Sequence, residues 1–380
     1  MDVAKIENLF AENFERFGEL GASVSIWKNG REAVNLAAGW CDREKSRVWT
    51  PQTPVLIYSI TKALSAACIL HCLEKNGLTL ETRVADIWPE FGAAGKEAIT
   101  LGELLSHRAG SPALQREIDV FDHDAVAAEL ALQPMLWPRD AGHGYHPRTF
   151  GFLLDELVRR LAHVPLGEYW RHEFAQPLGL DTWIGLPLEK VLSVATLYPP
   201  RVAPRDDAFL RAFSDPSSIT HRAFGSPRGL HTVSSMNTAE ARAASFPAFG
   251  GISTGNSLAK FFAMLASGGR LDGRRFFSEN ALSWMSTTLS GGFDKVLQTQ
   301  TAFSAGFMKD PLDENGVKIR RLFGPSLNAF GQPGAGGSVA FADLERGVSF
   351  AYVMNQMEPG VLPNPKSLRL IDALFDQSSM

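Results

Sequence analysis

One apolar segment of the chain begins with two residues that together can form an activated nucleophile. Ser59 is followed three positions later by Lys62, and residues three apart on a helix lie on the same face. A serine hydroxyl is a weak nucleophile at neutral pH, but a lysine whose pKa is lowered by burial can act as its base. The pair therefore predicts nucleophilic catalysis by serine.

Spacing alone does not single out this pair, because the chain contains three Ser-x-x-Lys matches. Ser25 lies in a segment typical of a strand, where residues three apart point to opposite faces. Ser257 begins a predicted helix whose Lys260 falls on the solvated side. Only Ser59 and Lys62 begin a helix that is almost wholly apolar, and such a helix provides the burial that a lysine base requires.

Ser253 is a competing candidate, because residues 251–255 match Gly-x-Ser-x-Gly, the pattern of a nucleophile elbow. An elbow needs a buried strand before the serine and a helix after it. Pro247 falls where that strand should be, so Ser253 or Thr254 is more simply interpreted as a helix N-cap. We therefore favour Ser59 as the nucleophile.

Two further segments carry groups that could complete a site. The first, 143–146, holds a tyrosine between two histidines and alone would be a polar turn. The second, 331–338, is rich in glycine, which allows backbone to approach a ligand and leaves N–H groups free for an oxyanion. It precedes a strand and opens no helix, which excludes a dinucleotide fingerprint. Cys68, His71 and Cys72 could suggest a metal cluster, but on an apolar helix the cysteines are more simply interpreted as buried small side chains. No His-Glu-x-x-His or paired Cys-x-x-Cys motif occurs.

The composition of the 380 residues is that of a soluble globular protein, with 45% apolar and 21% charged residues. A net charge of −4 argues against nucleic acid or an anionic membrane as a partner, and no apolar run reaches about 18 residues. The N-terminus lacks the blocks of a signal peptide. Three cysteines, few and odd in number, favour a reducing compartment, so we expect a cytoplasmic enzyme.

Strands are predicted at both ends of the chain and helices between them. Asn29-Gly30 separates two apolar runs, Ala22–Trp27 and Ala33–Ala38, as in a β-hairpin. The other predicted strands are Ala302–Met308, Val317–Phe323, Gly337–Phe341 and Val348–Met354. The sequence therefore predicts an α+β fold: an antiparallel sheet built from the N-terminal hairpin and the C-terminal strands, flanked by helices, with a helical domain inserted.

The expected domains follow from this order of elements. Residues 1–78 and 290–380 form the sheet domain, and residues 79–289 form a mostly helical domain. Within the latter, 193–247 is loop-rich and is either an excursion that covers the substrate or a long connection. Helices are predicted over 4–18, 59–76, 149–163, 256–267, 278–285 and 368–375, and a capping box at Thr100 and Glu103.

Three of these segments together resemble a known superfamily. The Ser59 and Lys62 motif, Gly144-Tyr145-His146 and Gln332-Pro333-Gly334 occur in the order typical of the serine β-lactamases and penicillin-binding proteins. Leu104-Leu105-Ser106-His107 and 250–254 are similar as well, so the match covers nearly the whole chain. The branch that the chain resembles most is the family VIII carboxylesterases, which are similar to class C β-lactamases. The resemblance implies a β-lactamase-like fold.

The resemblance also implies an activity and roles for single residues. Ser59 would be acylated by a short- to medium-chain ester, with Lys62 and Tyr145 as the general-base pair. The backbone N–H groups of Ser59 and Ala335 would bind the oxyanion. The residues expected to bind substrate are Gln332, Gly334 and His146. No metal or organic cofactor is implied, and the partner would be a small-molecule ester.

Two departures from the family pattern bear on the substrate. Pro147 stands where the lactamases usually have Asn, and Gln332 stands where the third motif usually begins with Lys or His. Two unit charges about 4 Å apart interact by roughly 4 kcal/mol at a surface-like dielectric. Losing that charge at position 332 disfavours β-lactams that carry a carboxylate and favours neutral esters. It also disfavours a Tyr145 phenolate and so favours Lys62 as the base.

Two alternatives remain open at this point. One is β-lactam hydrolysis or acyl transfer to a second alcohol or amine within the same superfamily. The other is a non-catalytic descendant that serves in binding or assembly, for which Gln332 would be a sign of decay. The intact Ser59, Lys62 and Tyr145 argue against the second alternative.

Overall fold

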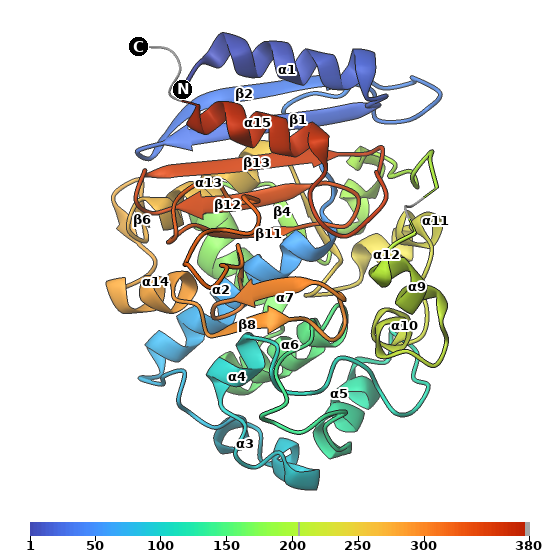
Figure 1. The fold of residues 1–380 in the computed structure, drawn as a ribbon, viewed down its shortest axis with the longest axis vertical. Coiled ribbons are helices and arrows are strands. Elements are labelled where there is room, and N and C mark those ends of the chain that lie inside the picture. The colour runs from blue at the N-terminus through green and yellow to red at the C-terminus, as the bar shows by residue number, and fades with distance from the viewer. Residues whose placement is uncertain (204–205, 377–380) are drawn as a thin grey trace.

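An eight-stranded antiparallel sheet crosses the molecule, and both ends of the chain contribute to it (Figure 1). The computed structural model describes residues 1–203 and 206–376. The strands are β1 (Gly21–Lys28), β2 (Arg31–Gly39), β8 (Ser290–Phe293), β9 (Gln300–Phe303), β10 (Met308–Lys309), β11 (Phe330–Pro333), β12 (Val339–Asp343) and β13 (Val348–Met354). Their order in the sheet is β2-β1-β13-β12-β11-β10-β9-β8, so the N-terminal hairpin pairs with the last strand. The predicted fold is confirmed.

The hairpin forms where the sequence predicts it. Asn29 and Gly30 have φ angles of 50° and 72°, the left-handed conformations that a tight hairpin turn needs. β1 then pairs with β13 with Val24 opposite Tyr352. Every residue of β13 is buried, because helices cover both faces of the sheet at this strand.

Alternate residues of β13 identify which helices lie on which face. The Ser349 hydroxyl donates to Ala259 O of α13 (Gly255–Ala266). Tyr352 points the other way, where Asn13 of α1 (Val3–Arg16) contacts its hydroxyl and also the backbone of α15 (Pro365–Phe375). α1 and α15 therefore cover one face of the sheet and α13 the other (Figure 1).

α2 (Thr61–Lys75) is the central helix of the molecule, with twelve buried residues. A helix that is apolar nearly all round belongs in the interior, as its sequence predicts. It packs against α6 (Thr149–Ala162), α7 (Leu166–Trp170) and α14 (Glu279–Ser286). All the predicted helices and the capping box at Thr100, which begins α4 (Leu101–Leu105), are present. α13 lies within 79–289, the predicted helical domain, yet it packs on the sheet. The predicted domain boundaries therefore stay a prediction.

The remaining elements are short. They are α3 (Val84–Ile87), α5 (His123–Leu132), α8 (Gln176–Leu178), α9 (Ala208–Ser214), α10 (Ile219–Gly225), α11 (Val233–Met236) and α12 (Ala239–Ala243), with strands β3 (Val55–Leu56), β4 (Thr182–Ile184), β5 (Gly251–Ser253), β6 (Arg270–Leu271) and β7 (Arg274–Arg275). The order β3-β5-β4 makes a second small sheet beside Ser59.

One predicted strand is wrong, and Ala302–Met308, predicted as one strand, forms the two strands β9 and β10. The prediction also omits β8 and β11 of the large sheet and the short strands β3 to β7. Val317–Phe323 forms no strand, because Asp310 holds it as a loop by accepting from the N–H groups of Leu322 and Phe323. β8 and β11 were not predicted because both contain glycine, a residue type that is uncommon in strands. β11 matters most, since it carries Gln332 into the sheet.

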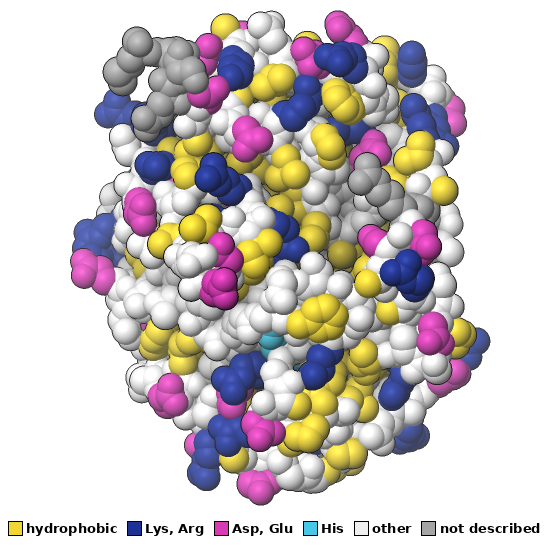
Figure 2. Space-filling model, in the orientation of Figure 1, with side chains coloured by type: hydrophobic (Ala, Val, Ile, Leu, Met, Phe, Trp, Pro, Cys, Tyr) yellow, Lys and Arg dark blue, Asp and Glu magenta, His cyan; other side chains and the backbone are white. Residues whose placement is uncertain are grey.

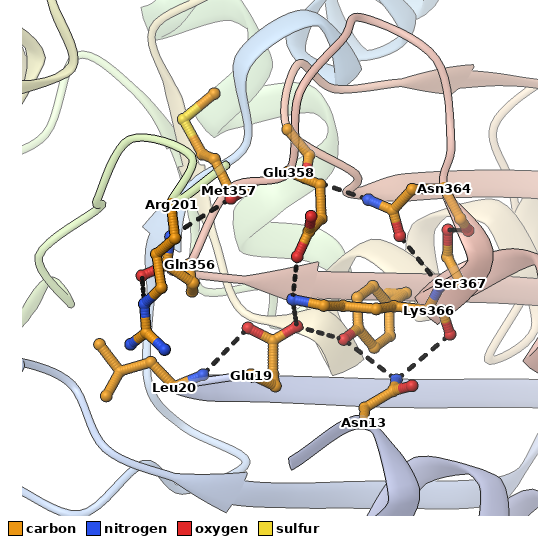
Figure 3. A network of polar contacts seen from close by, with 12 residues as sticks. Asn13, Glu19, Leu20, Arg201, Gln356, Met357, Glu358, Asn364, Lys366 and Ser367 are labelled. Carbon is orange, nitrogen blue, oxygen red and sulfur yellow. Dashed lines mark hydrogen bonds and ion pairs between the residues drawn. The ribbon is translucent and has the colours of Figure 1, made fainter. Parts of the chain in front are cut away.

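A buried polar network joins the two ends of the chain (Figure 3). Lys366 on α15 forms ion pairs with Glu19 at 3.3 Å and with Glu358 at 2.7 Å. Glu19 also accepts from the Tyr352 hydroxyl at 2.7 Å. The backbone N–H of Glu358 donates to Gly336 O at 2.9 Å, so the network also fixes the turn after β11.

The surface and the helices give limited information about partners. On the face shown in Figure 2, acidic and basic side chains are scattered among hydrophobic ones. Of the helices in residues 1–203 and 206–376, none has the length and apolar character that a membrane crossing requires. The same residues contain no cluster of three or more His, Cys, Asp or Glu side chains that could hold a metal ion.

Candidate active site

Ser59 lies in a single 3-10 turn, Tyr58–Ile60, directly before α2. Tyr58 has a φ of 43°, an unusual conformation for a residue with a bulky side chain and one that concentrates at functional sites. Lys62, in the first turn of α2, places its Nζ 3.2 Å from Ser59 Oγ. The structure thus brings together the pair that the spacing predicts.

Lys62 is completely buried, and its other neighbours are uncharged. Nζ donates to Pro147 O at 2.7 Å and to Ala248 O at 2.9 Å. Among the described residues, no carboxylate forms an ion pair with this amine. Burial therefore lowers the pKa of Lys62 well below its usual value.

This arrangement suits a neutral amine. A neutral lysine has two N–H donors and one lone pair, and two carbonyl oxygens, Pro147 O and Ala248 O, stand within reach of the donors. The third neighbour of Nζ is Ser59 Oγ, towards which the lone pair then points. The geometry allows the serine proton to pass to Lys62 without a further rearrangement.

Tyr145 completes the polar groups around the serine. Its hydroxyl interacts with Ser59 and accepts from Gln332 Nε2 at 3.3 Å, and its ring centroid lies 4.8 Å from Lys62 Nζ. Burial raises the pKa of Tyr145, and the hydrogen bonds from Ser59 and Gln332 only partly oppose this. Tyr145 is therefore a neutral phenol at neutral pH, able to donate a proton but poorly suited to removing one.

Asp294 positions Tyr145, and no sequence pattern marks it as a residue of the site. This fully buried carboxylate accepts from the Tyr145 N–H at 3.0 Å and also from the N–H groups of Val296 and Leu297, each at 2.9 Å. Its other oxygen accepts from the Thr301 hydroxyl at 3.0 Å. Asp294 thus ties the tyrosine turn to β9 from a position 149 residues away in the chain.

His146 was predicted to bind substrate, but the structure gives it a different environment. It is fully buried, its Nδ1 lies 2.7 Å from Gly144 O, and its Nε2 accepts from Ser111 N–H at 3.0 Å. Burial lowers the pKa of His146 to about 3. With both ring nitrogens occupied inside the protein, His146 supports the turn and has no group left for a substrate.

The third motif lies on β11 and in the turn that follows it. Gln332 is buried, with its amide against Tyr145. At Gly334 a Cβ would collide with Ile57 O, so glycine is required for the turn to approach the segment that carries Ser59. The N–H groups of Ser59 and Ala335 donate to no acceptor in the described part of the chain, and both residues line the same cleft. These two groups have the character of an oxyanion hole.

Ser253 has more of the elbow context than predicted, yet it lies away from the cleft. It ends β5, a strand that the sequence did not reveal, and α13 follows. The side chain is fully buried, with its hydroxyl 2.6 Å from Thr182 Oγ1. Thr254 is the helix N-cap, as predicted, since its side chain accepts from Ser257 N–H.

A cleft of about 930 Å³ opens beside Ser59. α9, α10 and α11, all within residues 193–247, supply much of its lining. Phe209, Phe213 and Phe224 form a cluster of rings there, with centroids 5.5 to 5.8 Å apart. Of the two roles considered for the loop-rich stretch, the position of these helices favours covering the substrate.

Within the described residues, neither a histidine nor a carboxylate hydrogen-bonds to Ser59 or Lys62. Ser59 therefore has a lysine and a tyrosine beside it, where many other serine hydrolases have a histidine and an aspartate. The Beta-lactamase family model matches residues 8–374, and the chain belongs to this family.

Individual relatives agree with this assignment over nearly the whole chain. "Esterase/beta-lactamase LipL" of Mycobacterium tuberculosis is 29% identical over 370 residues, which span 93% of this chain and 81% of that protein. The crystal structure of a penicillin-binding protein homolog from Caulobacter crescentus is 37% identical with a TM-score of 0.87, covering 98% of this chain and 96% of that one. A family VIII carboxylesterase is 32% identical with a TM-score of 0.85, covering 97% and 96%. The resemblance noted from the sequence is confirmed.

Proposed function

We propose that this protein is a serine esterase that cleaves short- to medium-chain carboxylic esters through an acyl-enzyme on Ser59. One observation carries the proposal: the Nζ of a buried lysine with no carboxylate partner lies 3.2 Å from the serine hydroxyl. Two relatives named as an esterase/beta-lactamase and a family VIII carboxylesterase support the same reaction class.

Acylation follows from the positions of the groups. Ser59 Oγ attacks the ester carbonyl while its proton passes to Lys62 Nζ. The carbonyl oxygen becomes an oxyanion between the N–H groups of Ser59 and Ala335. When the tetrahedral intermediate collapses, the C–O bond to the alcohol breaks, and Lys62 with Tyr145 returns the proton to the leaving oxygen.

Deacylation runs through the same groups in reverse. A water molecule enters in place of the alcohol and attacks the acyl carbonyl, while Lys62 accepts its proton. The second tetrahedral intermediate breaks the bond to Ser59 Oγ, which recovers its proton. The products are the free acid and the original serine. None of these steps requires a metal or cofactor.

β-Lactam hydrolysis is the second candidate, supported by the family and by the name of the Mycobacterium tuberculosis relative. Gln332 weighs against it, since a buried neutral amide takes the place of a cation beside Tyr145.

We also infer a cytoplasmic location, for which three buried free thiols, Cys41, Cys68 and Cys72, give support.

Ser59→Ala tests the proposed function. The variant should lose at least about 1,000-fold in kcat/KM for 4-nitrophenyl butyrate, because the nucleophile is gone, while its circular dichroism stays that of the wild type. Ser253→Ala is the matched control and should keep full activity. Undiminished hydrolysis by Ser59→Ala, or a fluorophosphonate adduct on another residue, would refute the assignment. A chromogenic cephalosporin in the same assay measures the second candidate.

A further inference from the structure

The cleft beside Ser59 carries more positive charge than the protein as a whole. Its lining includes four arginines and one glutamate, whereas the chain has a net charge of −4. Arg228 pairs with Glu117 at 3.2 Å, and Arg116 pairs with Glu129 at 3.6 Å. The other two arginines, Arg148 and Arg222, form no ion pair with any carboxylate in the described ranges.

Arg148 is the unusual member of this set, because it is only 6% exposed. Its Nη2 donates to Gly229 O at 2.7 Å, and its Nη1 donates to Phe224 O at 3.4 Å and lies 3.0 Å from His231 Nδ1. Its Nε has no hydrogen-bond partner among the described residues. The guanidinium carbon also lies 4.9 Å from the centre of the Phe249 ring, a cation–π contact. None of these neighbours carries a negative charge, so no anion balances Arg148.

The charge persists at neutral pH, and it lies close to the reaction centre. Burial lowers the pKa of Arg148 only to about 10, so the guanidinium stays protonated. The residue follows Pro147, whose carbonyl holds Lys62, and it lines the cleft together with Ser59. Its charge also acts on the phenol of Tyr58, the residue before the nucleophile.

A buried, unpaired guanidinium costs stability, so its presence needs a reason. Part of that reason is local, since its hydrogen bonds hold the segment 224–231 against the cleft. An uncharged donor could make the same hydrogen bonds to these neutral acceptors, however. The hydrogen bonds alone therefore do not explain why this residue carries a charge. Where a protein departs from the usual rules of stability at a functional site, the departure usually contributes to ligand binding.

We propose that Arg148 is a specificity-determining residue that binds a carboxylate carried by the ester substrate. The inference rests on the proposed esterase function and names its substrate class: esters in which the acyl or the alcohol half bears an anionic group. Charge-assisted hydrogen bonds to a carboxylate would supply the missing compensation. Arg148 would then supply a positive charge elsewhere in the cleft, away from Gln332 and Tyr145, so that the enzyme also accepts esters that carry a carboxylate.

Two pairs of esters test the proposal, each pair alike except for one carboxylate. Mono-4-nitrophenyl adipate is compared with 4-nitrophenyl hexanoate for the acyl half, and 4-acetoxybenzoate with its methyl ester for the alcohol half. In one of the two pairs, the wild-type kcat/KM for the charged ester should be at least equal to that for the neutral ester. Arg148→Met should lower kcat/KM for that charged ester by about 10- to 100-fold and for its neutral partner by less than about threefold.

The controls separate charge from positioning. Arg148→Lys keeps the charge and should restore part of the preference, while Arg275→Met, on exposed β7, should change neither ester. Equal losses on both esters of each pair would show that Arg148 only holds the segment 224–231, and the proposal would fail. If Arg148→Met does not fold, the wild type decides, because kcat/KM for the charged ester alone must fall as ionic strength rises.

The failure of this proposal can be distinguished from failure of the esterase function. If Ser59→Ala still hydrolyses 4-nitrophenyl hexanoate, the proposed function itself is wrong. If Ser59→Ala is inactive on that neutral ester but the wild type rejects both charged esters, the esterase stands and the assignment of Arg148 falls.

Discussion

At the scale of single residues, the proposed chemistry depends on the protonation of Lys62. Burial lowers the pKa of this amine, and the amine must be neutral to accept the serine proton. kcat/KM should therefore fall as pH drops through the lowered pKa, at a pH well below 10.5. His146, with a pKa of about 3, changes its protonation only near that pH and so causes no fall in kcat/KM at neutral pH. The pH range in which kcat/KM falls is the acidic limb of the pH–rate profile. A pH–rate profile with 4-nitrophenyl butyrate measures the limb, and activity that rises towards acid would contradict a lysine base.

Gln332→Lys tests the electrostatic coupling around Tyr145. A second positive charge beside the tyrosine disfavours protonated Lys62, so the acidic limb should move to lower pH by roughly one to three units. The same charge should increase cephalosporin hydrolysis from its wild-type level. Gln332→Met removes the hydrogen bond without adding charge and should not lower the pH of the limb. An unmoved limb in Gln332→Lys would show that position 332 does not act on the base.

The closeness of Ser59 and Lys62 could be predicted from the sequence, but the groups that support them could not. Ser59 and Lys62 are three residues apart on one helix, so local geometry alone brings them together. Lys62 is held by the carbonyls of Pro147 and Ala248, and every residue carries a carbonyl, so no residue type marks them. Asp294 is likewise invisible in sequence, because only the folded chain places it against Tyr145.

At the scale of elements, α9 and α10 form a small two-helix unit over the cleft. α9 has no fully buried residue, and its main packing partner is α10. The rings of Phe209 and Phe213 contact Phe224 across the pair, and Phe213 remains 42% exposed. Few buried contacts mean low local stability, so we expect these helices to adjust to the length of an acyl chain.

Phe213→Ala should raise KM for longer acyl chains. Losing part of the contact of one ring costs roughly 1 kcal/mol, or about a fivefold increase in KM for 4-nitrophenyl octanoate. The acetate ester is too short to need this surface, so its KM should not change. Leu192→Ala, at a side chain that is 90% exposed and outside the cleft lining, is the control. Equal effects on acetate and octanoate would exclude a role in chain-length preference.

The strands differ in how well the sequence predicts them, for a physical reason. β13 is buried on both faces and has a continuous apolar sequence, so it was predicted with its observed bounds. β11 has the sequence Phe-Gly-Gln-Pro, and residues such as Gly and Pro are depleted in strands. It forms because β10 and β12 pair with it, which is tertiary information. The motif residue whose setting was hardest to predict, Gln332, therefore lies on the strand with the weakest signal.

At the scale of the whole molecule, the site depends on contacts that join the two ends of the chain. The site lies between a helix near residue 60 and a strand near residue 330, so the sheet must bring the N- and C-terminal segments together. The network around Lys366 does this in the interior (Figure 3). Through Glu358 it also reaches Gly336, the neighbour of Ala335, whose N–H is the proposed oxyanion donor.

Lys366→Met should destabilise the protein because it leaves Glu19 buried without its cation. Breaking a buried ion pair by removing one partner typically costs about 3–5 kcal/mol, so the midpoint of urea unfolding should fall clearly. The double variant Glu19→Gln and Lys366→Met removes both charges and should recover much of the loss, since a paired polar interior and an uncharged one differ little in stability. Lys5→Met, which removes an ion pair between exposed side chains, is the matched control and should change the midpoint little. If Lys366→Met unfolds at the wild-type midpoint, or if the double variant is weaker than the single one, charge pairing is not what joins the two ends.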